Sequence, residues 1–292
     1  MITGTITALI TPFKNNGAID FVALERIIRL QIEGGVNGIL VAGSTGEGLL
    51  LTDEERESLV NFAREVIDRR VLLIVGSSCV STRNAVKQAI QAEKLKANAV
   101  LSIVPFYVKP KQDGIIQHFI DIHDNSNIPI ILYNNPSRCS VSISVDSAIE
   151  VFKRARVVAM KDSDCDLTRV GKLKEARPDI ALLSGDDPSL LGYLSSGGDG
   201  TVSVISNVVP GIVSAMVGTW RKGDESKSRV LDAMLRPLNN VLSMEPNPIP
   251  VKYALHKKGL IENELRKPLT RASAGLSRAI DLNLIDDSAQ AA

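Results

Sequence analysis

The sequence predicts an α/β protein built as a (β/α)8 TIM barrel with a C-terminal helical appendage. Eight short apolar segments recur along the chain, separated by about 25–30 residues that contain one helical pattern each. These segments are apolar throughout rather than alternating, which is typical of parallel strands covered on both faces. After the eighth segment only helical patterns follow. A doubly wound open sheet is the alternative, but it usually contains fewer strands.

Turn residues and helix caps separate the expected elements. Asp20 is a cap for the first helix, which ends at Gly34-Gly35, and Thr52 and Glu55 form a capping box for the second. Later helices are expected at residues 81–95, 114–124, 145–152, 167–176 and 188–195. The expected strands cover residues 5–10, 38–41, 70–75, 99–104, 128–133, 157–162, 180–184 and 201–205.

The tail is expected to be helical. Its helical patterns lie at residues 212–220, 225–238, 250–258 and 272–281. We therefore divide the chain into a barrel catalytic domain at residues 1–224 and a C-terminal helical domain at residues 225–292.

Composition narrows the class of protein. The 44% hydrophobic and 23% charged content describes a soluble globular chain, and a net charge of +1 disfavours nucleic-acid or acidic-membrane partners. The N-terminus lacks the basic flank of a signal peptide, and no apolar run reaches the roughly 18 residues of a membrane span. We therefore expect a cytoplasmic protein.

Cysteine and histidine spacing predicts no metal and no cofactor. The three cysteines, which form no CxxC pair, and the three histidines, which form no HExxH motif, are Cys79, Cys139, Cys165, His118, His123 and His256. We interpret the cysteines as reduced and inert.

Lys161 is the candidate nucleophile. It closes the apolar strand at residues 157–162, and in such a barrel the active site forms at the carboxyl ends of the strands. Burial there disfavours the ammonium form, and a neutral lysine can form a Schiff base with a carbonyl substrate. The alternative is a surface lysine at a strand end.

Other strand ends supply the groups that Schiff-base chemistry needs, namely hydroxyls that move protons and donors that bind a carboxylate. Each also has a structural interpretation: an ordinary turn, a core tyrosine or a solvated arginine. The candidates are Ser44, Thr45, Tyr107, Tyr133 and Arg138; in addition, Gly185 follows the seventh strand and Val202 lies in the eighth.

With these residues in place, the sequence resembles the dihydrodipicolinate synthase family of the class I pyruvate aldolase superfamily, which includes N-acetylneuraminate lyase. The resemblance covers essentially the whole chain. Its motifs are Gly43-Ser44-Thr45-Gly46-Glu47, Tyr133-Asn134-x-Pro136-x-Arg138, Met160-Lys161-Asp162, Leu183-Ser184-Gly185-Asp186-Asp187 and Glu245-Pro246-Asn247-Pro248-Ile249-Pro250-Val251-Lys252.

The resemblance implies a synthase that condenses pyruvate with L-aspartate-4-semialdehyde to 4-hydroxy-tetrahydrodipicolinate, in diaminopimelate and lysine biosynthesis. Lys161 would form the Schiff base, and Arg138 would bind the semialdehyde carboxylate. The hydroxyl relay would comprise Tyr133, Thr45 with Ser44, and Tyr107 from a neighbouring subunit, so a homotetramer (a dimer of dimers) is expected. Gly185 and Val202 would line the pyruvate pocket.

Two departures and three rival functions remain. Ser44 replaces the synthase's usual threonine, and Cys139-Ser140 replaces a common Thr-Gly. A lyase for a 2-keto-3-deoxy sugar acid or N-acetylneuraminate would need neutral hydrogen-bond donors in place of Arg138. A non-catalytic keto-acid-binding barrel would leave Lys161 unmodified, and a pyridoxal phosphate enzyme would need a phosphate cup that the sequence does not show.

The resemblance also implies weak or absent inhibition by lysine. Many members bind lysine at an interface site with a glutamate for its amine and histidine, asparagine and tyrosine nearby. The corresponding positions in this chain are Asn84 (after Arg83), Asp53 or Arg56, Val80 and Phe106. Loss of the glutamate would cost about 1.5–3 kcal/mol of binding free energy.

Overall fold

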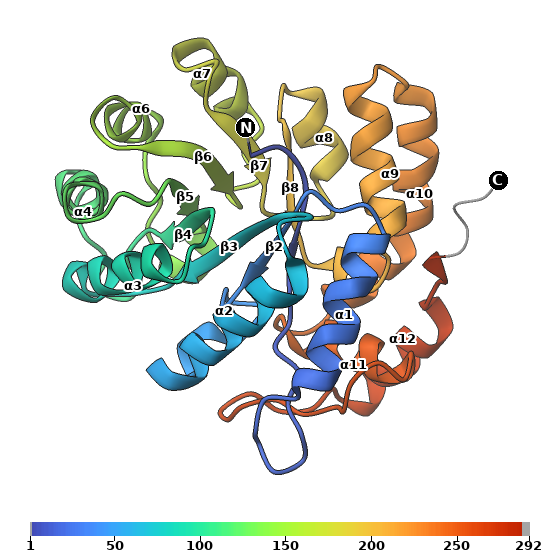
Figure 1. The fold of residues 1–292 in the computed structure, drawn as a ribbon. Helices are drawn as coiled ribbons and strands as arrows, with labels where there is room; N and C mark the ends of the chain where they lie inside the picture. The colour runs from blue at the N-terminus through green and yellow to red at the C-terminus, as the bar shows by residue number, and fades with distance from the viewer. Residues whose placement is uncertain (1, 288–292) are drawn as a thin grey trace. The chain divides into compact units, whose positions relative to one another are not determined.

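The predicted fold is confirmed. A computed structural model describes residues 2–287, and within that range eight parallel strands follow one another in sequence order around a closed barrel (Figure 1). The strands are β1 (Gly4–Ala8), β2 (Gly38–Val41), β3 (Leu72–Ser77), β4 (Ala99–Ile103), β5 (Ile130–Asn134), β6 (Val157–Asp162), β7 (Ala181–Ser184) and β8 (Gly200–Ser203). Every residue of β2, β4, β5, β7 and β8 is buried, as expected for parallel strands that are covered on both faces.

The chain divides into two compact units. The first, unit 1, comprises Ile74–Val202 with residues 2–3, and the second, unit 2, comprises Gly4–Leu73 with residues 203–287. Neither unit ends at residue 224. The expected boundary between a barrel domain and a C-terminal helical domain therefore stays a prediction.

Unit 1 contains the lysine strand. Its helices are α3 (Thr82–Lys94), α4 (Gln112–Asn125), α5 (Pro136–Cys139), α6 (Val145–Arg154), α7 (Thr168–Ala176) and α8 (Leu190–Ser195). In Figure 1, α3, α4 and α6 lie outside the strands β4–β6. The pairing of β5 with β6 sets Tyr133 opposite Lys161 and Asn134 opposite Asp162. This register places the two candidate catalytic residues side by side.

The short helix α5 was not expected from the sequence. Its N-cap is Asn135, whose side-chain oxygen accepts a hydrogen bond from the Arg138 backbone N–H, and Pro136 occupies the first helical position. A helix of one turn gives no periodic apolar pattern, so only this cap could have indicated it.

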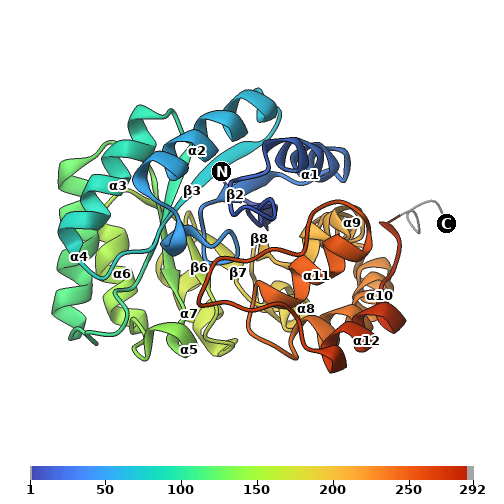
Figure 2. The same cartoon turned by 90° about the horizontal axis from the view of Figure 1, so that it is seen from below.

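Unit 2 pairs β1 with β2 and contains the remaining helices. These are α1 (Phe21–Glu33), α2 (Asp53–Ile67), α9 (Pro210–Arg221), α10 (Glu225–Leu242), α11 (Ile249–Lys257) and α12 (Ala274–Asn283), with 3₁₀ turns η1 (Gly48–Leu50) and η2 (Ile205–Asn207). Figure 2 shows α9 to α12 gathered together. The Asp20 cap and the Thr52–Glu55 capping box are confirmed. Among the described helices, none has the length and apolar character needed to cross a membrane.

One C-terminal helix is longer than expected. The sequence pattern ended it at residue 238, but α10 continues past Pro237 to Leu242. Leu238 and Val241 are buried. The helix therefore continues because its apolar face does, although a proline usually disrupts a helix interior.

Candidate active site

Lys161 and Tyr133 form a buried pair at the ends of β6 and β5. Lys161 is 6% exposed and Tyr133 5% exposed. The Lys161 Nζ atom lies 4.2 Å from the centroid of the Tyr133 ring. The alternative of a surface lysine is therefore wrong, because the amine is enclosed beside an aromatic ring that carries a hydroxyl.

The environment of Tyr133 favours release of its proton. Burial is the largest single effect and raises the pKa of the phenol. The charge of Lys161, hydrogen bonds with Asn135 and Ser163 and the charge of Arg138 together outweigh it, so the pKa lies below its ordinary value. Asn135 Nδ2 donates a hydrogen bond of 2.7 Å to Tyr133 Oη. Sequence reasoning passed over Asn135, although its position before a proline is the signal of a cap.

Gly185 leaves the room that the Lys161 side chain occupies. The Gly185 N–H donates to the Asp162 carbonyl at 2.8 Å. A Cβ atom on residue 185 would lie 2.8 Å from Lys161 Cε and 2.0 Å from Ser163 Oγ. Any side chain here would displace the lysine. Val202, the other residue expected to line the pocket, is buried in β8.

Tyr107 and Arg138 are exposed at the surface of unit 1, unlike the buried Lys161 and Tyr133. Tyr107 follows β4 and is 86% exposed, with a left-handed backbone φ of 66°. Arg138 is exposed on α5, five residues after Tyr133 in the chain. Arg138 is near enough to Tyr133 for its charge to help lower the pKa of the phenol.

In unit 2, Ser44 and Thr45 lie in a tightly folded loop after β2. Thr45 is buried, and Asn247 Nδ2 donates a hydrogen bond of 2.9 Å to its Oγ1. Two residues later, Glu47 adopts a left-handed φ of 54°. A Cβ atom on Gly48 would lie 1.9 Å from the Ala42 carbonyl oxygen. The sequence of this loop is therefore constrained by its own backbone as well as by chemistry.

A buried ion pair anchors this loop to the C-terminal segment. The Glu47 carboxylate contacts Lys252 Nζ, with both side chains 0% exposed, and accepts a 2.7 Å hydrogen bond from the Arg266 backbone N–H. Lys252 Nζ also donates to the Glu264 carbonyl at 2.9 Å. Burial lowers the pKa of Lys252 to about 8, and attraction to Glu47 opposes that effect without cancelling it. Sequence reasoning assigned no role to Glu47 or Lys252.

Two of the cysteines have thiols that hold their protons more tightly than usual, and no metal site is found in residues 2–287. Burial raises the pKa of Cys139 to about 11, and burial together with Asp186 raises that of Cys165. Within the described residues, no three His, Cys, Asp or Glu side chains gather as a metal site would require.

Known proteins match this chain along nearly its whole length. The model of the dihydrodipicolinate synthetase family matches residues 1–282. A 4-hydroxy-tetrahydrodipicolinate synthase of Thermotoga maritima is 41% identical over 278 residues, 94% of each chain. A solved dihydrodipicolinate synthase from Thermotoga maritima has a TM-score of 0.95 at 39% identity, covering 97% of this chain and 98% of its own. A solved structure described as the first monomeric dihydrodipicolinate synthase variant has a TM-score of 0.94 at 39% identity, covering 97% and 95%.

These matches extend well beyond single motifs, and the relatives share the barrel as well as the sequence. The chain belongs to the dihydrodipicolinate synthetase family.

Proposed function

We propose that this protein is a cytoplasmic lyase that condenses pyruvate with L-aspartate-4-semialdehyde to 4-hydroxy-tetrahydrodipicolinate, for diaminopimelate and lysine biosynthesis. The observation that carries the proposal is the buried contact between Lys161 Nζ and the Tyr133 ring at 4.2 Å. Membership of the family and the names of its relatives support the choice of substrates.

Lys161 is the nucleophile of the proposed reaction. Its neutral amine adds to the ketone carbon of pyruvate, and loss of water gives an imine. Loss of a methyl proton gives an enamine, whose carbon attacks the aldehyde of the second substrate. The amino group of that substrate then attacks the imine carbon, closes the ring and releases Lys161. No cofactor takes part.

Tyr133 moves protons in these steps. Its lowered pKa allows it to accept a proton from the nitrogen of Lys161 after the amine has added to pyruvate, and to deliver that proton to the carbinolamine oxygen, which leaves as water. Thr45, with Ser44, and Tyr107 complete the hydroxyl relay. Gly185 and Val202 line the pyruvate pocket.

Arg138 binds the carboxylate of the semialdehyde. Arg138 is exposed on α5, and a guanidinium binds a carboxylate through two parallel hydrogen bonds. A polyol substrate would gain less from this charge, so Arg138 favours the semialdehyde over a 2-keto-3-deoxy sugar acid or N-acetylneuraminate.

The proposed assembly is a homotetramer, a dimer of dimers, in which Tyr107 enters the site of a neighbouring subunit. The 86% exposure of Tyr107 supports this role, because an exposed aromatic side chain is available to a partner. The monomeric variant among the relatives shows that the fold also occurs without a partner.

A substrate panel tests the function. The protein should consume pyruvate with aspartate semialdehyde and be inactive in cleaving keto-sugar acids or N-acetylneuraminate. Arg138→Ala should raise the KM for the semialdehyde about 10–100-fold, the loss of about 1.5–3 kcal/mol, and that for pyruvate far less. Equal changes in both KM values would leave Arg138 with a structural role only, and cleavage of a sugar acid would contradict the substrate assignment.

A further inference from the structure

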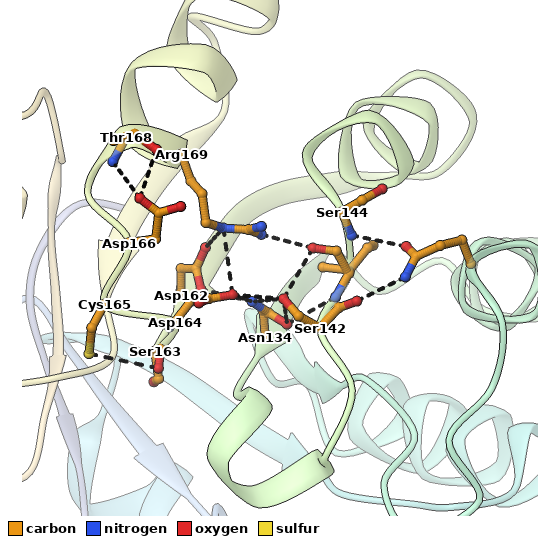
Figure 3. Close-up of polar contacts among 12 residues, drawn as sticks. Asn134, Ser142, Ser144, Asp162, Ser163, Asp164, Cys165, Asp166, Thr168 and Arg169 are labelled. Atoms are coloured by element: carbon orange, nitrogen blue, oxygen red, sulfur yellow. Dashed lines mark hydrogen bonds and ion pairs between the residues drawn. The ribbon is translucent and has the colours of Figure 1, made fainter.

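A second polar cluster lies directly behind the Lys161–Tyr133 pair. Successive side chains of a strand point to opposite faces. Asp162 and Asn134, which follow Lys161 and Tyr133 and are cross-strand partners, therefore point away from that pair. Figure 3 shows Asp162 in contact with Arg169, and Asn134 in contact with Asp162 and with Ser142 of the loop after β5.

The cluster contains two carboxylates and one guanidinium. Arg169 Nε lies 3.0 Å from Asp162 Oδ2 and 3.9 Å from Asp164 Oδ2, and its Nη2 donates to the Ile143 carbonyl at 2.9 Å. Asp162 and Arg169 are buried. Breaking a buried pair of this kind leaves an uncompensated charge.

Neutral groups fasten the carboxylates in place. Asn134 Nδ2 donates to Asp162 Oδ1 at 3.0 Å and to Asp164 Oδ2 at 3.3 Å. The Asp164 backbone N–H donates to Asp162 Oδ1 at 3.0 Å, and Ser142 Oγ donates to Asp164 Oδ2 at 2.7 Å. The carboxylates are thus held by hydrogen bonds, while Arg169 contributes the positive charge of the cluster.

Arg169 is the cation that contacts Asp162 and Asp164. Other ionisable groups lie around the cluster and the amine. They are Tyr133, Arg138, Cys165, Asp186, Tyr193 and Asp199.

Most of these groups are neutral or have partners of their own. Burial raises the pKa of Tyr193, and Asp162 adds to the effect, so Tyr193 stays neutral, as does Cys165. Asp199 pairs with Lys174 at 2.6 Å, and Asp186 accepts hydrogen bonds from Ser189. The exposed Asp166 and Lys172 are screened by water.

We propose that Arg169 is a positioning residue for the reaction, which offsets the Asp162 and Asp164 carboxylates so that the adjacent Lys161 amine can give up its proton. This inference rests on the proposed function, because it concerns the amine that forms the imine. A carboxylate near an amine favours the charged ammonium, which is not nucleophilic. Asp162, the next residue in the chain, would act in this way if Arg169 did not neutralise it.

The pH dependence of imine formation tests the inference. The rate at which pyruvate and cyanoborohydride form a covalent adduct is followed by intact-mass spectrometry from about pH 5.5 to 9.5. Arg169→Gln should move the midpoint up by about 0.5–1 pH unit, the size expected of one charge at roughly 10 Å. Asp162→Asn should move it down by a similar amount, and the double variant should lie near the wild type.

Two further variants keep the test decisive if Arg169→Gln folds poorly. Asp164→Asn removes the carboxylate whose side chain is 23% exposed, and should lower the midpoint with little loss of stability. Asp166→Asn removes the same charge from an exposed site in the same loop and should leave the midpoint unchanged.

The inference would be overturned if the midpoint were unshifted in Asp164→Asn and in every folded variant of Arg169 and Asp162, even if their rates were slower. The proposed function would then still stand. Absence of an adduct in the wild type would overturn both.

Discussion

Two buried carboxylates, one in each unit, follow the proposed catalytic residues and are neutralised in different ways. Asp162 comes directly after Lys161 and pairs with Arg169, seven residues further along the chain. Glu47 comes two residues after Thr45 and binds Lys252 and the backbone of Arg266, which is 219 residues away. The charge that follows the nucleophile is therefore paired within a short stretch of sequence. The loop that holds the hydroxyls depends on the C-terminal segment.

The largest expected effect comes from the local region. Tyr133→Phe removes the proton carrier beside Lys161 and keeps the ring, so it should slow turnover by about 10²–10⁴-fold while the fold persists. Thr45→Val should cost less, about 10–10²-fold, because Ser44 supplies a second hydroxyl. Steady-state rates and circular dichroism check both variants. A loss below about fivefold in Tyr133→Phe would assign the proton transfer to another group.

Breaking the long-range ion pair should mainly cost stability. Lys252→Met leaves the buried Glu47 charge without its lysine, which should lower the free energy of unfolding by about 3–5 kcal/mol. Arg29→Met breaks the exposed pair with Glu25 and should cost less than about 1 kcal/mol. Urea unfolding measures both. Similar small losses in the two variants would mean that the Glu47 network does not anchor the loop.

Alkaline pH should distinguish Lys252, which titrates, from Arg169, which does not. An unfolded lysine loses its proton near about pH 10.4, whereas Lys252 in the folded chain loses it near 8. Between these values the unfolded chain binds more protons, so the Lys252 contribution to the free energy of unfolding rises with pH, by up to about 1.4 kcal/mol per unit.

Lys252→Met should lack this rise in a urea series at about pH 7.5, 8.5 and 9.5. Arg169→Met should keep it, because a guanidinium does not titrate in this range. An identical slope in the wild type and in Lys252→Met would contradict the assignment.

The smallest expected effect is that of added L-lysine on the reaction rate, because the chain lacks the glutamate expected to bind the lysine amine. Asn84 and Arg83 are exposed where relatives that bind lysine are expected to have a glutamate, and Arg56 is buried on α2, so Arg83 is the arginine that can repel a cation. Added L-lysine should therefore change initial rates little. Half-inhibition below about a millimolar, a binding free energy of roughly −4 kcal/mol, would show that other residues bind lysine here.

The features that could be predicted from the sequence are those that depend on a local pattern of residues. The barrel followed from eight apolar strands, and Lys161 and Tyr133 from their places at strand ends, because burial and strand direction act within a few residues. Asn135, Arg169 and the Glu47–Lys252 pair were not predicted. Their roles depend on contacts between elements, and a buried arginine or lysine looks like a solvated one until its partner is known.

One measurement tests the central claim, that Lys161 is the nucleophile. The protein is incubated with pyruvate and borohydride, and the adduct is weighed by intact-mass spectrometry and mapped by peptide analysis. We expect one pyruvyl group per chain, on Lys161, and no adduct in Lys161→Ala. An adduct that survives in Lys161→Ala, or one that maps to Lys252, would contradict it.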